Sequence, residues 1–92
     1  MSITVKFAVY GALKGGNENQ TQAVDVSGPL QAQIDASQGI VKIDNSTMGG
    51  DPAKGSGKHF AAIVDVDGEL GVCFACNENQ TIDFHHWIAT TY

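Results

Sequence analysis

Basic side chains, proline and long apolar runs are all scarce in this sequence of 92 residues. No apolar run approaches the ~20 residues that a membrane-spanning helix needs, which excludes a helical membrane span. Only five basic residues stand against ten acidic ones, so the formal net charge is −5. Phosphate backbones and anionic lipid surfaces both attract clustered basic side chains. The charge balance therefore disfavours nucleic acid and membrane surfaces as partners.

Cysteine occurs only twice, as Cys73 and Cys76. The surrounding residues have the pattern of a β-strand, where side chains three positions apart point to opposite faces of the sheet. We therefore expect no disulfide bond between them. The start of the chain shows no basic segment followed by an apolar one, so no secretory signal is visible. Reduced thiols and no visible signal together predict a cytoplasmic protein.

The residues that are present favour one small β-rich domain spanning 1–92. Hydrophobic residues make up 42% of the chain and charged residues 16%, which suits a globular protein with a core rather than a disordered one. Eleven glycines against two prolines indicate many tight turns, as in β-rich folds. A chain of this length is too short to divide into two cores.

Alternating apolar and β-branched residues predict about six strands. They are expected over 3–10, 22–26, 39–45, 59–66, 70–76 and 81–88. The spacing changes after Ser27, where Leu30 and Ile34 lie four residues apart and predict a short helix over 29–36. We predict an all-β or β-rich fold, an antiparallel β-sandwich with this helix at one edge or end. The alternative is an α+β fold in which the helix covers one face of a single sheet and Leu30 and Ile34 are central.

Five polar residues, Asn-Glu-Asn-Gln-Thr, occur twice in the chain, letter for letter. Each copy lies between predicted strands and consists of residues that favour turns, so both are predicted to be loops. Their amide and carboxylate groups offer the paired donors and acceptors that suit sugar hydroxyls. The candidate ligand-binding residues in the two copies are Asn17, Glu18, Asn19, Gln20, Asn77, Glu78, Asn79 and Gln80. The alternative is a pair of similar solvated turns.

Two further residues, Asp51 and Trp87, join this candidate site. Asp51 lies in the longest predicted loop, 46–58, and long loops in compact domains often flank binding sites. Alternation along the last predicted strand places Phe84 and His86 on the core side and leaves Trp87 on the outer face. An outward tryptophan there predicts a homo-oligomer contact or a ligand platform, unless the strand bends and Trp87 covers the rim of the core.

No pattern in the sequence predicts a metal site, a cofactor or a catalytic centre. The acidic segment 65–69 resembles the start of a calcium-binding loop, but the later ligands and the flanking helices of an EF-hand are missing. Cys73 and Cys76 lack a second pair of zinc ligands, and His85 and His86 are adjacent, so at most one of them faces any given site. No nucleophile–base pair or paired carboxylates remain. We therefore predict a protein that is not an enzyme.

Three groups of short motifs carry a resemblance to a known family. They are Tyr10-Gly11, then Val24-Asp25-Val26 with Leu30-Gln31, and finally Gly50-Asp51-Pro52 with Gly55 and Lys58. Together they resemble the small domain of unknown function at the C-terminal end of mitochondrial DnaJ-like co-chaperones, and its freestanding fungal and bacterial relatives. The resemblance implies a compact β-rich binding or interaction domain. It carries over no catalytic residues, and this chain has no counterpart of the J-domain.

The sequence thus predicts a non-enzymatic binding module. Its most specific form is a lectin-like protein that recognises a glycan or another polar ligand through the two repeated loops. The alternative is a protein-interaction or self-assembling domain without a small-molecule site. Saturable binding of one sugar would favour the lectin, and a concentration-dependent oligomer would favour assembly.

Overall fold

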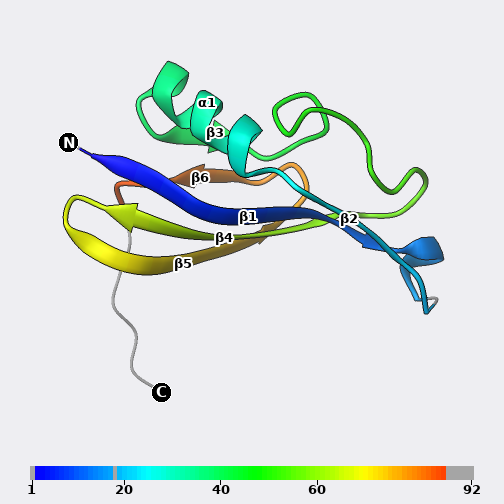
Figure 1. Ribbon diagram of the computed structural model, residues 1–92. Helices are drawn as coiled ribbons and strands as arrows, with labels where there is room; N and C mark the ends of the chain where they lie inside the picture. Colours follow the sequence, from blue (N-terminus) through cyan, green and yellow to red (C-terminus); the bar gives the residue numbers. More distant parts are fainter. Residues whose placement is uncertain (1, 18, 87–92) are drawn as a thin grey trace.

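A computed structural model describes residues 2–17 and 19–86 of the chain (Figure 1). The strands are β1 (Ile3–Leu13), β2 (Thr21–Asp25), β3 (Ile40–Lys42), β4 (His59–Val66), β5 (Glu69–Asn77) and β6 (Thr81–Asp83). One α-helix, α1 (Ser27–Ser37), and a short 3₁₀ turn, η1 (Lys14–Gly16), complete the regular structure of the described ranges. Six strands and one helix confirm the β-rich prediction.

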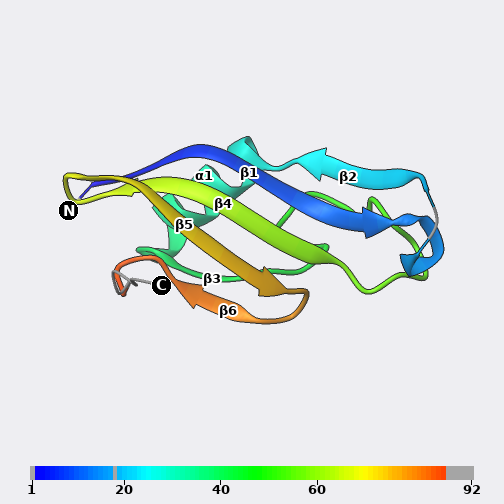
Figure 2. The ribbon, with the colours of Figure 1, turned by 90° about the horizontal axis from the view of Figure 1, so that it is seen from below.

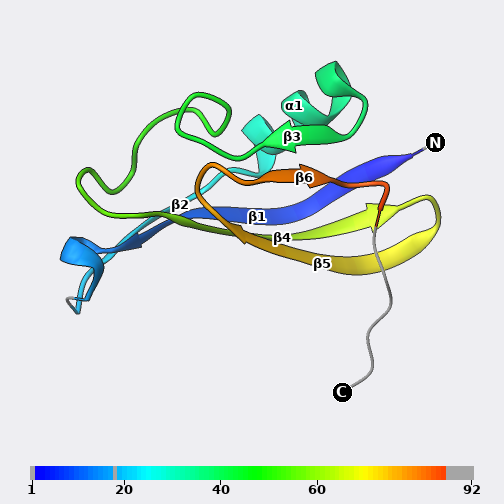
Figure 3. The ribbon, with the colours of Figure 1, turned by 180° about the vertical axis from the view of Figure 1, so that it is seen from behind.

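The strands form two antiparallel sheets of different size. The large sheet has the order β2-β1-β4-β5, and the small sheet pairs β3 with β6. Helix α1 and the small sheet lie side by side on one face of the large sheet, which we call the inner face (Figures 1 and 3). The view from below shows the opposite face, which we call the outer face, with β1, β4 and β5 in front of the helix (Figure 2).

The core lies between the inner face and the layer of α1, β3 and β6. Residues along β4 alternate strictly, because neighbouring side chains of a strand point to opposite faces. Phe60, Ala62, Val64 and Val66 are buried, whereas His59, Ala61 and Ile63 are exposed on the outer face. On the other side of the core, Leu30 and Ile34 of α1 are buried, and the helix covers the sheet over β1, as the α+β alternative predicts.

A β-bulge in β1 changes which residues face outward. The pairing of β1 with β4 shifts between Val5 and Phe7, so Val5 pairs with Val64 and Phe7 pairs with Ile63. The extra residue, Lys6, therefore lets both Val5 and Phe7 keep regular partners on β4. As a result Phe7 and Ile63 lie next to each other on the outer face.

Side-chain hydrogen bonds attach α1 to β1. The Gln31 amide oxygen accepts a hydrogen bond from the Val5 N–H at 2.8 Å, and its amide nitrogen donates to the Ile3 carbonyl at 3.0 Å. The Ser27 Oγ accepts from the Ala8 N–H at 2.9 Å. Because Ser27 is already the first helical residue, α1 begins two residues earlier than predicted. These hydrogen bonds satisfy backbone groups in the first part of β1, which does not pair with β2.

The predicted boundaries differ most around the small sheet. The strand expected over 39–45 is reduced to β3, and the one expected over 81–88 ends at Asp83. Phe84 is buried as predicted, but the prediction that His86 faces the core is wrong, because its side chain is 83% exposed. The strand ends there since Asp83 accepts the His85 N–H at 3.0 Å and closes a turn. Residue 88 lies outside the described part of the chain.

Candidate functional site

The second copy of the repeated sequence forms the turn between β5 and β6. Asn79 adopts a left-handed conformation, with φ of 74°, and its N–H donates to the Ile43 carbonyl at 2.7 Å. The Gln80 amide oxygen accepts from the Asn77 N–H at 2.7 Å. Asparagine tolerates positive φ better than most residues, which explains its place at this turn. Much of the hydrogen-bonding capacity of this copy is therefore used inside the fold.

Glu78 and Asp51, both predicted site residues, meet at one buried lysine. The Lys58 side chain is 4% exposed, and its Nζ lies 3.1 Å from Asp51 Oδ1 and 3.5 Å from Glu78 Oε1. The Nζ also donates to the Ser56 carbonyl at 2.8 Å. Glu78 Oε1 accepts from the backbone N–H of Lys58 as well, at 3.1 Å. The long loop before β4 and the turn after β5 are thus held together by one internal ion-pair cluster.

The charges of this cluster shift the pKa values of its members. Burial alone would lower the pKa of Lys58, but the hydrogen bond and charge of Asp51, with those of Glu78, raise it above its ordinary value. Desolvation would raise the pKa of Asp51, yet its bonds to Lys58 and to the Ala53 N–H lower it overall. Lys58 and Asp51 therefore form an ion pair at neutral pH, and the same ammonium group also contacts Glu78, which suits a structural role.

Tyr10 lies beside this cluster in the core. It is fully buried, and its hydroxyl donates to Asn45 Oδ1 at 2.7 Å. Burial, together with the nearby charges of Glu78 and Asp44, raises the pKa of Tyr10 to about 12. The phenol is therefore neutral over the physiological range and acts as a hydrogen-bond donor.

The first copy of the repeat occupies a different environment, at the tip of the β1–β2 hairpin. Asn17, Asn19 and Gln20 are exposed, and the contact that closes the tip runs from the Lys14 N–H to the Gln20 carbonyl at 2.9 Å. Figures 1 and 2 both show this tip and the β5–β6 turn at separate places on the molecule. The repeat thus produces one hairpin tip and one inter-sheet turn rather than a single surface. Glu18 lies outside the described residues, as does Trp87.

The two cysteines point to opposite faces of the large sheet, as predicted. Cys73 is exposed on the outer face, and Cys76 is partly buried and packs against the core. Burial raises the pKa of the Cys76 thiol. Within residues 2–17 and 19–86, no group of three or more His, Cys, Asp or Glu side chains is placed to hold a metal ion. In the same ranges no helix has the length and hydropathy to span a membrane.

The outer face of the large sheet presents a continuous apolar surface. Phe7 and Ile63 are 47% and 43% exposed, and Leu13 is 47% exposed at the other end of β1. Two open hollows lie between these side chains and share Val9 and Ala61. The first, the Gly11 hollow, has a volume of about 310 Å³, and the second, the Cys73 hollow, about 470 Å³. We call the two together the outer-face groove.

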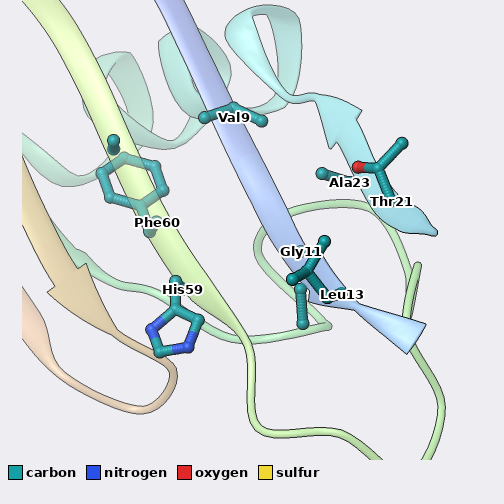
Figure 4. A pocket seen from close by; sticks show the side chains of 9 residues that line it. Val9, Gly11, Leu13, Thr21, Ala23, His59 and Phe60 are labelled. Carbon is teal, nitrogen blue, oxygen red and sulfur yellow. The ribbon is translucent and has the colours of Figure 1, made fainter. Parts of the chain in front are cut away.

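The floor of the Gly11 hollow exists because residue 11 has no side chain. A Cβ at Gly11 would lie 2.3 Å from the Gln22 carbonyl oxygen and 2.8 Å from the Cβ of Ala23, so only glycine fits against β2 here. Figure 4 shows Gly11 on β1 between Ala23 of β2 and His59 of β4. The small Ala23 and Ala61 side chains leave the space above it unfilled.

The polar and charged groups nearest the groove stand at its two ends. Lys6 Nζ pairs with Asp65 Oδ2 at 3.6 Å beyond the Phe7 end. At the opposite end His59 Nδ1 lies 3.0 Å from the Asn77 side-chain oxygen. Among the described residues, no Asp, Glu, Lys or Arg lines either hollow. The middle of the surface is thus apolar, with polar side chains at its ends.

Sequence reasoning missed this surface, although its signal was present. An antiparallel strand with one solvated face alternates apolar and polar residues. In 59–66 the outward positions include Ala61 and Ile63, and in 70–76 they are Cys73 and Ala75. The middle of both strands is therefore apolar on both faces, a pattern that is typical of a strand whose second face also makes contacts. The sequence of one strand does not say which outward residues of other strands lie beside it, so the surface becomes visible only once the strand register is known.

Comparison with known proteins adds no relative. No family model, no curated protein and no solved structure matches this chain. The resemblance to the co-chaperone domain therefore stays a prediction from its short motifs. The functional argument rests on the geometry of the two candidate surfaces, the repeated segments and the outer-face groove.

Proposed function

We propose that this protein is a non-enzymatic interaction domain that associates with itself through the outer face of its large sheet. The observation that carries the proposal is the apolar surface built by Phe7, Ile63 and Leu13 around the outer-face groove. Contiguous apolar patches of about 300–600 Å² on a soluble protein often mark an interaction site. Contact with another apolar surface would remove these side chains from water at a gain of about 25 cal/mol per Å².

The shape and lining of the groove favour a protein surface over a small molecule. Ligand pockets enclose most of their ligand and contain a few convergent polar groups that fix its orientation. Both hollows here are open, and the polar side chains that line them are Thr21 and His59 at one end and the Cys73 thiol at the other. A broad, shallow apolar surface with a polar margin is typical of the centre of a protein–protein interface.

Glycan recognition through the repeated segments remains the alternative prediction. Its support is the exposure of Asn17, Asn19 and Gln20 at the hairpin tip. The second copy has less to offer a ligand, because Glu78 is bound to Lys58 and Gln80 closes its own turn. The self-association proposal therefore has the stronger support.

Two isoleucine variants test the proposal. Ile63 on the outer face and Ile40 on β3 are 43% and 54% exposed, and both lie in strands. Ile63→Lys places a charge in the groove, whereas Ile40→Lys places the same charge on the opposite layer. Because both side chains already reach solvent, each lysine can extend its ammonium into water without unfolding the core.

Sedimentation velocity over about 10–500 μM is the measurement, a range that suits a small interface. We expect the wild-type protein to associate with rising concentration, Ile40→Lys to behave alike, and Ile63→Lys to stay monomeric. Circular dichroism confirms the fold of each variant. A wild-type protein that is monomeric throughout this range, or an Ile63→Lys variant that associates normally, contradicts the proposal.

A further inference from the structure

We infer that Lys58 and Asp51 condense to an amide inside the folded chain, with Glu78 as the group that carries a proton between them. The observation that carries this inference is one buried lysine side chain in contact with two carboxyl groups. It goes beyond the proposed function, because it concerns the ion-pair cluster and not the outer face. The reaction occurs once in each molecule, so it is compatible with a non-enzymatic protein.

The reacting groups are already in contact in the folded chain. The Lys58 side chain is 4% exposed, and its Nζ lies 3.1 Å from Asp51 Oδ1 and 3.5 Å from Glu78 Oε1. The Glu78 N–H donates to the Lys58 carbonyl at 2.9 Å, and Glu78 Oε1 accepts from the Lys58 N–H at 3.1 Å, so Glu78 is fixed beside the lysine. Well-oriented groups within one molecule react as if present at about 10⁵–10⁸ M.

The three side chains supply every proton that the condensation moves. One proton of the Lys58 ammonium passes to the Asp51 carboxylate, and the neutral amine attacks Cγ of Asp51. The nitrogen then gives a second proton to Glu78, which passes it to the leaving oxygen. The Nζ–Cγ bond forms, the Cγ–Oδ2 bond breaks, and Oδ2 departs as water. No oxidant or other reactant is needed, and the loss of one charge of each sign leaves the net charge at −5.

Two neighbouring residues of the loop favour attack on Asp51. The Ala53 N–H donates to Asp51 Oδ1 at 3.1 Å, the oxygen on which negative charge develops as the amine attacks. Pro52 follows Asp51 in the sequence and has no N–H. The backbone nitrogen that attacks the side chain of an aspartate in other sequences is therefore blocked here, and Lys58 meets no such competition for this carboxyl group.

The ion pair is the state that precedes the reaction, and it makes the reaction slow. The pKa of Lys58 is raised and that of Asp51 is lowered, so at neutral pH the charged pair predominates. The neutral amine is scarce, and the proton transfers limit the rate. A positioned acid–base group accelerates such transfers by about 10²–10⁴-fold. Loss of the Glu78 carboxylate should therefore slow the condensation by about a hundredfold or more.

Intact mass spectrometry of the full chain tests the inference. We expect wild-type protein, kept folded at neutral pH until its mass is constant, to be lighter than its sequence by one water molecule. Lys58→Arg keeps the positive charge but should retain the full mass, because guanidinium stays protonated. Glu78→Gln should lose water at about one hundredth of the wild-type rate or less. Glu69→Gln is the matched control, since Glu69 is exposed at the start of β5 and should not change the rate.

Tryptic digestion of the wild-type protein locates the bond. Trypsin cleaves after Lys42 and Lys54 but not after an acylated lysine, so the expected product joins 43–54 to a peptide that begins at residue 55. Fragmentation should place the junction between Asp51 and Lys58. Circular dichroism confirms the fold of each variant.

Three results would contradict the inference. The wild-type protein keeps its full mass, the bond joins Lys58 to Glu78, or the water is lost elsewhere, as in cyclisation at Asp67-Gly68. A folded Glu78→Gln variant that reacts at the wild-type rate would refute the role of Glu78. None of these results bears on self-association, which uses other residues.

Discussion

Tyr10 shows how a single residue of this protein is defined by its surroundings. The sequence places it on the first strand, but its neighbours Asn45, Asp44 and Glu78 come from distant segments. Burying a phenol costs little free energy when its hydroxyl donates a hydrogen bond, and Asn45 provides the acceptor. Ionising Tyr10 inside the fold would place a further negative charge near Glu78 and Asp44, so the stability that Tyr10 contributes depends on pH.

Tyr10 should limit the stability of the protein at alkaline pH. Its pKa is about 12 in the folded protein against 10.0 for an unperturbed tyrosine. Because the pKa is higher in the folded state, Tyr10 contributes fully to the free energy of unfolding below pH 10, and this contribution is lost as the pH rises toward 12. Urea unfolding of the wild-type protein and of Tyr10→Phe between pH 7 and 12 measures this contribution.

We expect Tyr10→Phe to be less stable at pH 7 by about 1 kcal/mol, because Asn45 loses its hydrogen-bond partner. The difference in free energy of unfolding between the two proteins should narrow or reverse above pH 10, since phenylalanine does not ionise. If this difference stays constant up to pH 12, Tyr10 is not the group that lowers the stability of the protein at alkaline pH.

At the scale of elements, the Lys58 cluster extends the contact between β4 and β5 beyond their last pair, His59 with Asn77. The long loop before β4 contributes Asp51 and Ser56, and the β5–β6 turn contributes Glu78. Figure 3 shows this loop beside the end of β1 and β2, on the same side of the large sheet as α1. Lys58 supplies one positive charge to two carboxyl groups, and removing it takes away the cation that both contact.

Lys58→Met should therefore destabilise the fold although it keeps an apolar stem of similar length. We expect a loss of about 2 kcal/mol in the free energy of unfolding, below the range for fully buried pairs because both carboxylates are partly exposed. Lys54→Met, on the same loop but exposed, is the matched control and should change stability by less than about 0.5 kcal/mol. Equal effects of the two changes in urea unfolding would refute a specific role for Lys58.

At the scale of the whole molecule, net charge opposes the proposed self-association. Each copy carries a formal charge of −5, and Asp25 lies in the same row of the sheet as Val9 and Ala61. Hydrogen bonds from the Ser27 side chain and N–H lower the pKa of Asp25 and keep it charged. Asp25 therefore adds a negative charge beside the outer-face groove.

Salt should for this reason strengthen the self-association. Raising the ionic strength from about 0.05 M to 0.5 M shortens the range of the repulsion between the two copies from more than 10 Å to a few ångströms. Apolar contacts persist under these conditions, so we expect the dissociation constant to fall. Asp25→Asn should associate more tightly at low salt and depend less on salt. An association that weakens with salt would instead indicate attractive ion pairs across the interface.

The local pattern of the chain determined the strands and the helix. Alternation in 59–66 predicted the bounds of β4 without error, and the spacing of Leu30 and Ile34 predicted the buried side of α1. These signals are local, because a strand or a helix repeats its orientation every few residues. The same pattern predicted that Cys73 and Cys76 face opposite sides of the sheet.

Only the tertiary structure decided what the polar and outward-facing residues do. Two identical copies of Asn-Glu-Asn-Gln-Thr have different surroundings, because Lys58 and Ile43 contact one copy and neither contacts the other in the described residues. The outer-face groove depends on the β-bulge beside Phe7 and on the pairing of β1 with β4, neither of which a single segment encodes. Local sequence specifies the direction of a side chain within its own element. Its neighbours come from the pairing of distant elements, and that pairing is chosen by the free energy of the whole fold.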